Sequence, residues 1–219
     1  MMNAEGRRFV GIDDRGGAIL QGGRFVGCEF VNCCLSLTHQ VAERSRLSGV
    51  ELIRCGVSRC EVGPGIIEDT RVDGLATDDL LILWGTLFRR VVLSGAIGKI
   101  KLNTRIDPTS GIRQAEFDAA RVAFYADSDW ALDISRARFA EFDMRGIPAH
   151  LFRRDPETQV VVTRERALAP GWRRHLSPSN KPWPFVIDLF LKDGDADTVL
   201  VAPLSAPKAK RDALLSGLR

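Results

Sequence analysis

Large apolar residues recur at every fifth position in residues 23–35 of this chain. Phe25, Phe30 and Leu35 mark the period, and a small residue stands two places before each of them. A period of five fits neither the 3.6-residue turn of an α-helix nor the two-residue alternation of a strand. It requires a backbone that turns a corner once in five residues, with two side chains directed inward and three outward. This requirement limits the fold more than any other feature of the sequence.

The same period continues in a second frame after a break at residues 38–45. Its anchor positions are Leu47, Leu52, Val57, Val62, Ile67, Val72, Thr77, Ile82, Leu87, Val92, Ile97 and Leu102. All but Thr77 are aliphatic, which a chain with 45% hydrophobic residues would reach by chance about once in a thousand for a preset frame. A third run covers residues 132–146. The predicted inward core residues of the three runs are Phe25, Phe30, Leu35, Leu52, Val57, Val62, Ile67, Val72, Ile134, Phe139 and Met144.

One pentad cannot bury its apolar face alone, so the pattern predicts stacked coils, with each short strand about 4.8 Å from the next. Three segments, Gly23-Arg24-Phe25, Cys28-Glu29-Phe30 and Ala137-Arg138-Phe139, carry a small residue, a variable one and a Phe. This pattern resembles the pentapeptide-repeat family, in a degenerate form because aliphatic residues replace Phe or Leu at many anchors. The resemblance implies a right-handed, four-sided β-helix. The predicted fold is therefore mainly β, a solenoid of about six coils over residues 1–147.

Two parts of the chain leave the five-residue period. Helical spacing of apolar residues predicts an inserted helix near residues 112–126, and the competing interpretation is another coil of the solenoid. The apolar face of that helix would hold Ile112, Ala115, Ala119, Val122, Ala123 and Ala126. The sequence of residues 148–219 indicates a small α/β segment. We expect it to cap the solenoid, because about 70 residues fold poorly alone and the open end of a solenoid has to be covered. Its predicted strands are 158–163 and 198–202, and its predicted helices are 164–175, 182–192 and 207–218.

Cysteine positions predict core packing and not zinc binding. Cys28, Cys33, Cys55 and Cys60 repeat with the coil period at the small inward position, where a thiol behaves as a small hydrophobe. Structural zinc usually takes cysteine pairs separated by two to four residues, and the separation of four here coincides with the coil period. Cys34 stands at an outward position and is the candidate for a reactive thiol. An odd number of cysteines, with no secretory signal in the first residues, predicts reduced thiols and a cytoplasmic location.

No catalytic residue, cofactor site or metal site is predicted, so the chain is not expected to be an enzyme. His39, His150 and His175 lie far apart, and no nucleophile motif accompanies them. Residues 193–197 carry three aspartates like the start of a calcium loop, but they lack its later Gly and its final acid. A turn between a helix and a strand is the preferred interpretation. A polysaccharide-cleaving β-helix would need paired carboxylates, and none stands out.

One basic and aromatic cluster near the end of the chain is a candidate phosphate-binding or nucleic-acid-binding surface. It consists of Trp172, Arg173, Arg174, His175, Lys181 and Trp183. The alternative is a Trp packed inside the cap with Arg residues beside it.

Charge and composition rank the possible functions. The net charge is +3, and no apolar run is long enough for a membrane span. The leading hypothesis is a non-catalytic interaction or scaffold protein whose solenoid surface binds an unidentified protein partner. Nucleic-acid binding through the basic cluster is the first alternative. Some members of the family imitate DNA and bind topoisomerases, but that role needs a strongly negative surface. A homodimer is compatible with the sequence, which specifies no oligomeric state.

Overall fold

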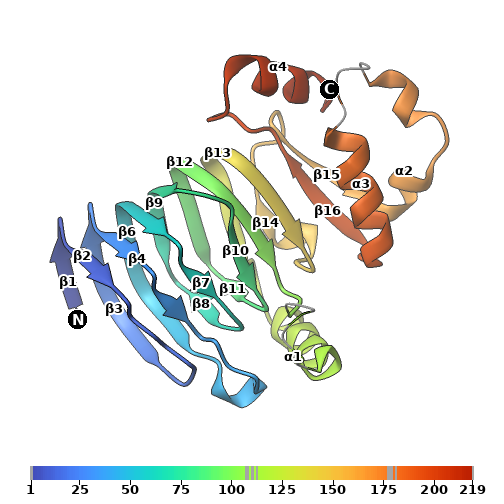
Figure 1. The fold of residues 1–219 in the computed structure, drawn as a ribbon. Helices are drawn as coiled ribbons and strands as arrows, with labels where there is room; N and C mark the ends of the chain where they lie inside the picture. Colours follow the sequence, from blue (N-terminus) through green and yellow to red (C-terminus); the bar gives the residue numbers. More distant parts are fainter. Residues whose placement is uncertain are drawn as a thin grey trace.

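A large, curled parallel sheet makes up most of the protein in the computed structural model, which describes residues 2–106, 109, 111, 113–176, 180 and 182–218 (Figure 1). The sheet has 14 strands. They are β1 (Met2–Glu5), β2 (Arg8–Val10), β3 (Ile19–Val26), β4 (Glu29–Val31), β5 (Cys34–Leu35), β6 (Arg46–Ser58), β7 (Glu61–Val62), β8 (Ile66–Glu68), β9 (Arg71–Thr77), β10 (Leu81–Trp84), β11 (Leu87–Arg89), β12 (Val91–Asn103), β13 (Leu132–Arg145) and β14 (Phe152–Arg153). The prediction of a mainly β protein is confirmed.

Strands pair with strands one pass later in the chain. Leu52 lies opposite Val72, and Val62 lies opposite Leu83. The interval is longer from Phe25 to its partner Leu52, because this pass includes the break at residues 38–45. The pass that follows β12 is longer still, because Ile97 lies opposite Phe139. In each pass the inward residues stack on those of the pass before and form a continuous apolar interior.

The chain turns at positions where glycine recurs. Gly27, Arg54, Gly74 and Gly95 occupy the same corner in successive passes, and their φ angles lie between 50 and 77°. Glycine adopts this left-handed region without strain, whereas a residue with a Cβ atom rarely does. The corner therefore explains why small residues repeat with the period of the sheet.

The predicted core residues lie against this interior. Phe25, Val72, Ile134, Phe139 and Met144 are buried in the main core. The remaining six are partly buried; five of them pack against the main core, and Leu35 lines the same interior cavity. Those six are Phe30, Leu35, Leu52, Val57, Val62 and Ile67.

The second sequence frame is wrong by one position from Ile82 to Val92, whereas its later anchors Ile97 and Leu102 lie inward as predicted, opposite Phe139 and Met144. Leu83 and Leu93, and not Ile82 and Val92, lie opposite the inward residues Val62 and Val72. Phe88 likewise takes the place predicted for Leu87, because it lies opposite Ile67. One extra residue in this pass moves the frame. Neighbouring strand residues point to opposite faces, so a shift of one exchanges inside and outside.

The helix predicted near residues 112–126 is confirmed as α1 (Gln114–Ala126), and the competing coil interpretation is wrong there. Its predicted packing face is also wrong, since Val122 is 63% exposed and Ala115, Ala119, Ala123 and Ala126 are exposed. Phe117 and Tyr125 are buried instead, and the Tyr125 hydroxyl accepts a hydrogen bond of 3.3 Å from the backbone N–H of Phe88. Aromatic rings bury far more apolar area than alanine and therefore determine which face packs. Ile112 lies outside the described residues.

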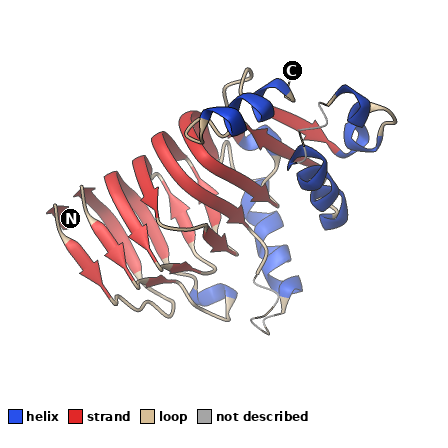
Figure 2. Ribbon diagram, turned by 45° about the horizontal axis from the view of Figure 1, so that its top comes forward, coloured by secondary structure: helices blue, strands red, loops and turns tan. Residues whose placement is uncertain are grey.

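The C-terminal segment packs on the end of the sheet that carries β13 (Figures 1 and 2). It contains η2 (Ala149–Leu151), β15 (Gln159–Thr163), α2 (Arg164–Leu168), η3 (Trp172–His175), α3 (Pro182–Asp193), β16 (Asp197–Val201) and α4 (Lys208–Ser216). One further short helix, η1 (Val41–Glu43), lies between β5 and β6. Both predicted strands and the two later helices are found close to their predicted ends. The helix predicted over residues 164–175 is instead two separate pieces, α2 and η3, because Pro170 and Gly171 lie between them.

Strand β16 lies between the curled sheet and the C-terminal helices. Val199 and Val201 belong to the main core, whereas Leu200 packs with Phe190 and Leu214 in a second core. Alternate residues of β16 thus pack into two different hydrophobic cores. The backbone N–H of Ser205 also donates to the Phe139 carbonyl at 2.9 Å, which satisfies an edge group of β13. No helix in the described part of the chain is both long and apolar enough to cross a membrane.

Candidate binding groove

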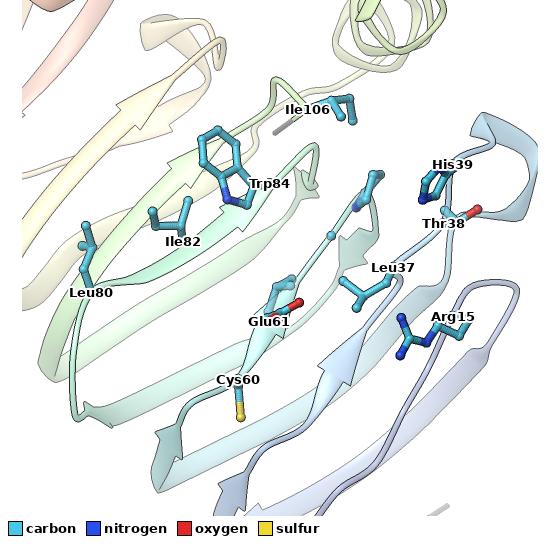
Figure 3. Close-up of a pocket in the computed structure, with 13 residues that line it drawn as sticks. Arg15, Leu37, Thr38, His39, Cys60, Glu61, Leu80, Ile82, Trp84 and Ile106 are labelled. Atoms are coloured by element: carbon cyan, nitrogen blue, oxygen red, sulfur yellow. The ribbon is translucent and has the colours of Figure 1, made fainter. Parts of the chain in front are cut away.

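A groove of about 520 Å³ lies on the outer side of the curled sheet (Figure 3). Ile82 and Trp84 of β10 lie along one side of it, and Leu37, Thr38 and His39 from the loop before η1 lie along the other. The groove therefore combines residues from two successive passes and from the break in the repeat. A hollow of this size is in the range that binds small ligands or single segments of a partner.

The side of the groove formed by β10 is apolar because β10 is apolar on both faces. Leu81 and Leu83 point to the interior cavity, so Ile82 and Trp84 face outward, and the exposed Leu80 extends their row. Other outward positions of the sheet carry ion pairs between successive passes. These pairs are Arg8 with Glu29, Arg24 with Glu51 and Arg46 with Glu68. The row on β10 is thus an apolar exception among outward positions that otherwise carry ion pairs.

Polar and charged side chains complete the groove. Arg15 is exposed and pairs with Asp13 at 2.8 Å, and His39 is also exposed. The exposed Glu61 of β7 lies between the two sides of the groove (Figure 3). The groove therefore has one aromatic and aliphatic side and carries both signs of charge. This composition suits a partner segment with apolar side chains and flanking polar groups.

The thiols near the groove are poor nucleophiles. Burial, followed by the negative charges of Glu61 and Asp13, raises the pKa of the Cys34 thiol. Burial also raises the pKa of the Cys60 thiol, which lines the groove. Because the thiolate is the reactive form, a raised pKa keeps both groups inert near neutral pH. The hypothesis of a reactive Cys34 finds no support in its surroundings.

The other cysteines belong to the interior of the sheet. Cys28, Cys33 and Cys55 are buried as predicted, and Cys60 is half-buried. The Cys55 thiol donates to the Phe25 carbonyl at 3.4 Å, so it links two neighbouring passes of the chain. No group of three His, Cys, Asp or Glu side chains within the described ranges is arranged to hold a metal ion.

The basic and aromatic cluster does not form one surface. Trp183 is only 5% exposed, and its indole N–H donates to the Leu214 carbonyl at 2.9 Å, so it belongs to the second core. Arg173 stacks over Trp172 at 4.6 Å and pairs with Asp188. Arg174 and His175 are exposed, as is His150 on η2, while Lys181 lies outside the described residues. Trp183 is therefore not part of the predicted surface, and the Arg173 guanidinium is already paired with the Asp188 carboxylate.

The three aspartates at residues 193–197 each contact an earlier part of the chain, and we call them the acidic clasp; Asp193 joins the C-terminal segment to β13. Asp193 pairs with the Arg145 guanidinium at 2.5 Å, and Asp195 pairs with Arg105 at 3.2 Å. The Asp197 carboxylate accepts a hydrogen bond from the backbone N–H of Ala149 at 2.8 Å. These contacts explain the dense run of acids without a bound cation.

Sequence reasoning missed the groove, although a signal was present. Residues 80–84 are all apolar, whereas the outward positions of other pentads are mostly polar. An apolar residue at every position of a strand predicts two buried or binding faces. Comparison with known proteins adds no assignment: no protein-family model matches the chain, and no curated protein matches it significantly.

Proposed function

We propose that this chain is a non-catalytic interaction protein that binds a partner protein through the groove beside β10. The observation that carries the proposal is the row of outward apolar side chains Leu80, Ile82 and Trp84 in a hollow. Trp is among the residues that contribute most to binding energy at protein interfaces. A short apolar segment of the partner would fill the groove, and its polar flanks would meet Arg15 and Glu61.

We further propose that the curled sheet is a right-handed, four-sided solenoid of the pentapeptide-repeat type. The proposal is supported by the interval of about four pentads between paired positions in the middle of the sheet, such as Leu52 with Val72 and Val62 with Leu83. The recurring corner that includes Gly27, Gly74 and Gly95 also supports it. A solenoid offers long flat faces, which suit protein partners. The free thiols of all five cysteines are compatible with a cytoplasmic location.

Two other functions rank lower. Nucleic-acid binding at η3 would rest on Arg173 and Arg174, and a loss of oligonucleotide binding after alanine substitution at both would support it. DNA mimicry needs a strongly negative surface, whereas this surface carries alternating Arg and Glu between successive passes. Both alternatives would leave Trp84 without a role.

Site-specific cross-linking in the native host tests the groove. A photo-reactive amino acid at position 82 is expected to capture one defined protein, and the same amino acid at the exposed Arg71 of β9 serves as the matched control. Trp84→Ala should reduce the capture at position 82 at least about tenfold, because a central Trp commonly supplies about 2 kcal/mol or more. Circular dichroism verifies that the variant folds. Equal capture at positions 71 and 82, or capture that Trp84→Ala leaves unchanged, contradicts the proposal.

A further inference from the structure

The first pass of the chain, residues 2–22, forms an uncovered end of the sheet. Strand β1 pairs with β3 on one side, and β2 pairs with β4 on one side; no described residue pairs with their other edges. The opposite end of the sheet is covered by the C-terminal segment (Figures 1 and 2). An open edge with free backbone donors and acceptors is a template for pairing with another chain.

Apolar side chains are exposed at the same end. Met2 is 54% exposed and Ile12 is 48% exposed, and both line the interior cavity of about 400 Å³. Phe9 and Leu20 line it too and are only half-buried, because no further pass stacks on them. The interior therefore reaches solvent at the first pass. Covering this end would remove a continuous apolar surface from water.

Two exposed charges of opposite sign flank the first corner. Glu5 and Arg7 stand on either side of Gly6, and neither side chain has an ion pair or hydrogen bond to any described residue. The next charged residue, Arg8, already pairs with Glu29 of the following pass. Glu5 lies opposite the uncharged Val26 of the following pass. Both charges are therefore available to a second copy of the chain.

We infer that residues 2–22 form the interface of a homodimer in which two copies meet end to end. A two-fold axis brings the same patch of both copies together, so that Glu5 of one copy faces Arg7 of the other and the two apolar ends cover each other. The same axis makes the free strand edges antiparallel, which allows them to pair. The length of this first pass is comparable to the roughly 20–30 residues that each partner gives to a standard interface.

Charge exchange tests this inference. Sedimentation equilibrium of the full chain over a wide concentration range should give a dimer for the unchanged protein. Glu5→Arg and Arg7→Glu each place like charges across the axis at two symmetric positions, and each should weaken dimerisation about 10- to 100-fold. The double variant Glu5→Arg/Arg7→Glu restores opposite pairs and should recover most of the affinity. Arg166→Glu, an exposed charge change on α2, should have no effect.

Several results would overturn the homodimer. They are a monomer at every concentration, an assembly larger than a dimer, single exchanges without effect, or a double exchange that fails to restore association. Both substituted side chains are exposed, and circular dichroism shows whether each variant keeps its fold. Arg15 belongs both to the groove and to residues 2–22, so capture of the partner at position 82 is measured for each variant as well. Loss of the dimer with unchanged capture shows that the two interactions are separate.

Discussion

Replacing Phe139 with alanine is expected to lower the free energy of unfolding by about 3–5 kcal/mol. The Phe139 side chain is fully buried, lies opposite Ile97 in the register and packs against the Phe142 ring at 4.5 Å. It belongs to the same core as Val199 of β16, so its loss opens a cavity where the sheet meets the C-terminal segment. Urea denaturation followed by circular dichroism measures the change.

Arg138→Ala is the matched control for Phe139→Ala. Arg138 is the preceding residue on β13, and its side chain is exposed, so its replacement should cost less than about 0.5 kcal/mol. Similar losses in the two variants would contradict the assignment of inner and outer faces at β13.

Arg145→Ala is expected to cost about 3 kcal/mol, because it breaks a buried ionic network. The Arg145 side chain is 3% exposed and pairs with Asp143 and with Asp193 of the acidic clasp, each at 2.5 Å. Removing one member of a buried pair usually costs about 3–5 kcal/mol. We expect a cost at the lower end of this range, because both aspartates keep another basic partner in the variant. Lys101 pairs with Asp143 at 3.0 Å, and Arg105 pairs with Asp193.

Lys210→Ala provides the comparison for Arg145→Ala. Lys210 of α4 pairs with Glu141 at 3.5 Å, but both side chains are about half exposed, so its loss should cost under about 1 kcal/mol. Urea unfolding curves of both variants at low and high salt separate the two cases. If Arg145→Ala is as mild as Lys210→Ala, the clasp does not hold the C-terminal segment.

Part of this fold could be predicted because its repeat can be recognised within a short stretch of sequence. The five-residue spacing around Phe25 and Phe30 already required stacked short strands, and these two residues do pair with the next anchors, Leu52 and Val57. The shift of the frame between Ile82 and Val92 could not be predicted, since one inserted residue changes no composition and reverses the faces of β10. Alanines in α1 likewise gave a regular helical pattern, although the larger Phe117 and Tyr125 decide which face is buried.

The functional features depended on contacts between distant parts of the chain. The clasp joins Asp193 to Arg145 and Asp195 to Arg105, and the members of each pair are far apart in the sequence. The groove combines a loop near His39 with β10. Neither pairing has a sequence signature, whereas the apolar run at residues 80–84 was visible and indicates a second apolar face. The basic cluster at residues 172–183 was visible too, but burial of its second Trp removes that residue from the surface.

Unfolding free energies of Leu83→Ala and Ile82→Ala test the central claim most directly, because that claim is the orientation of β10. Leu83 is buried opposite Val62, so its replacement should cost about 2–5 kcal/mol, whereas Ile82 faces the groove and should cost under about 1 kcal/mol. A larger loss for Ile82→Ala than for Leu83→Ala would contradict both the register of the sheet and the groove built on it.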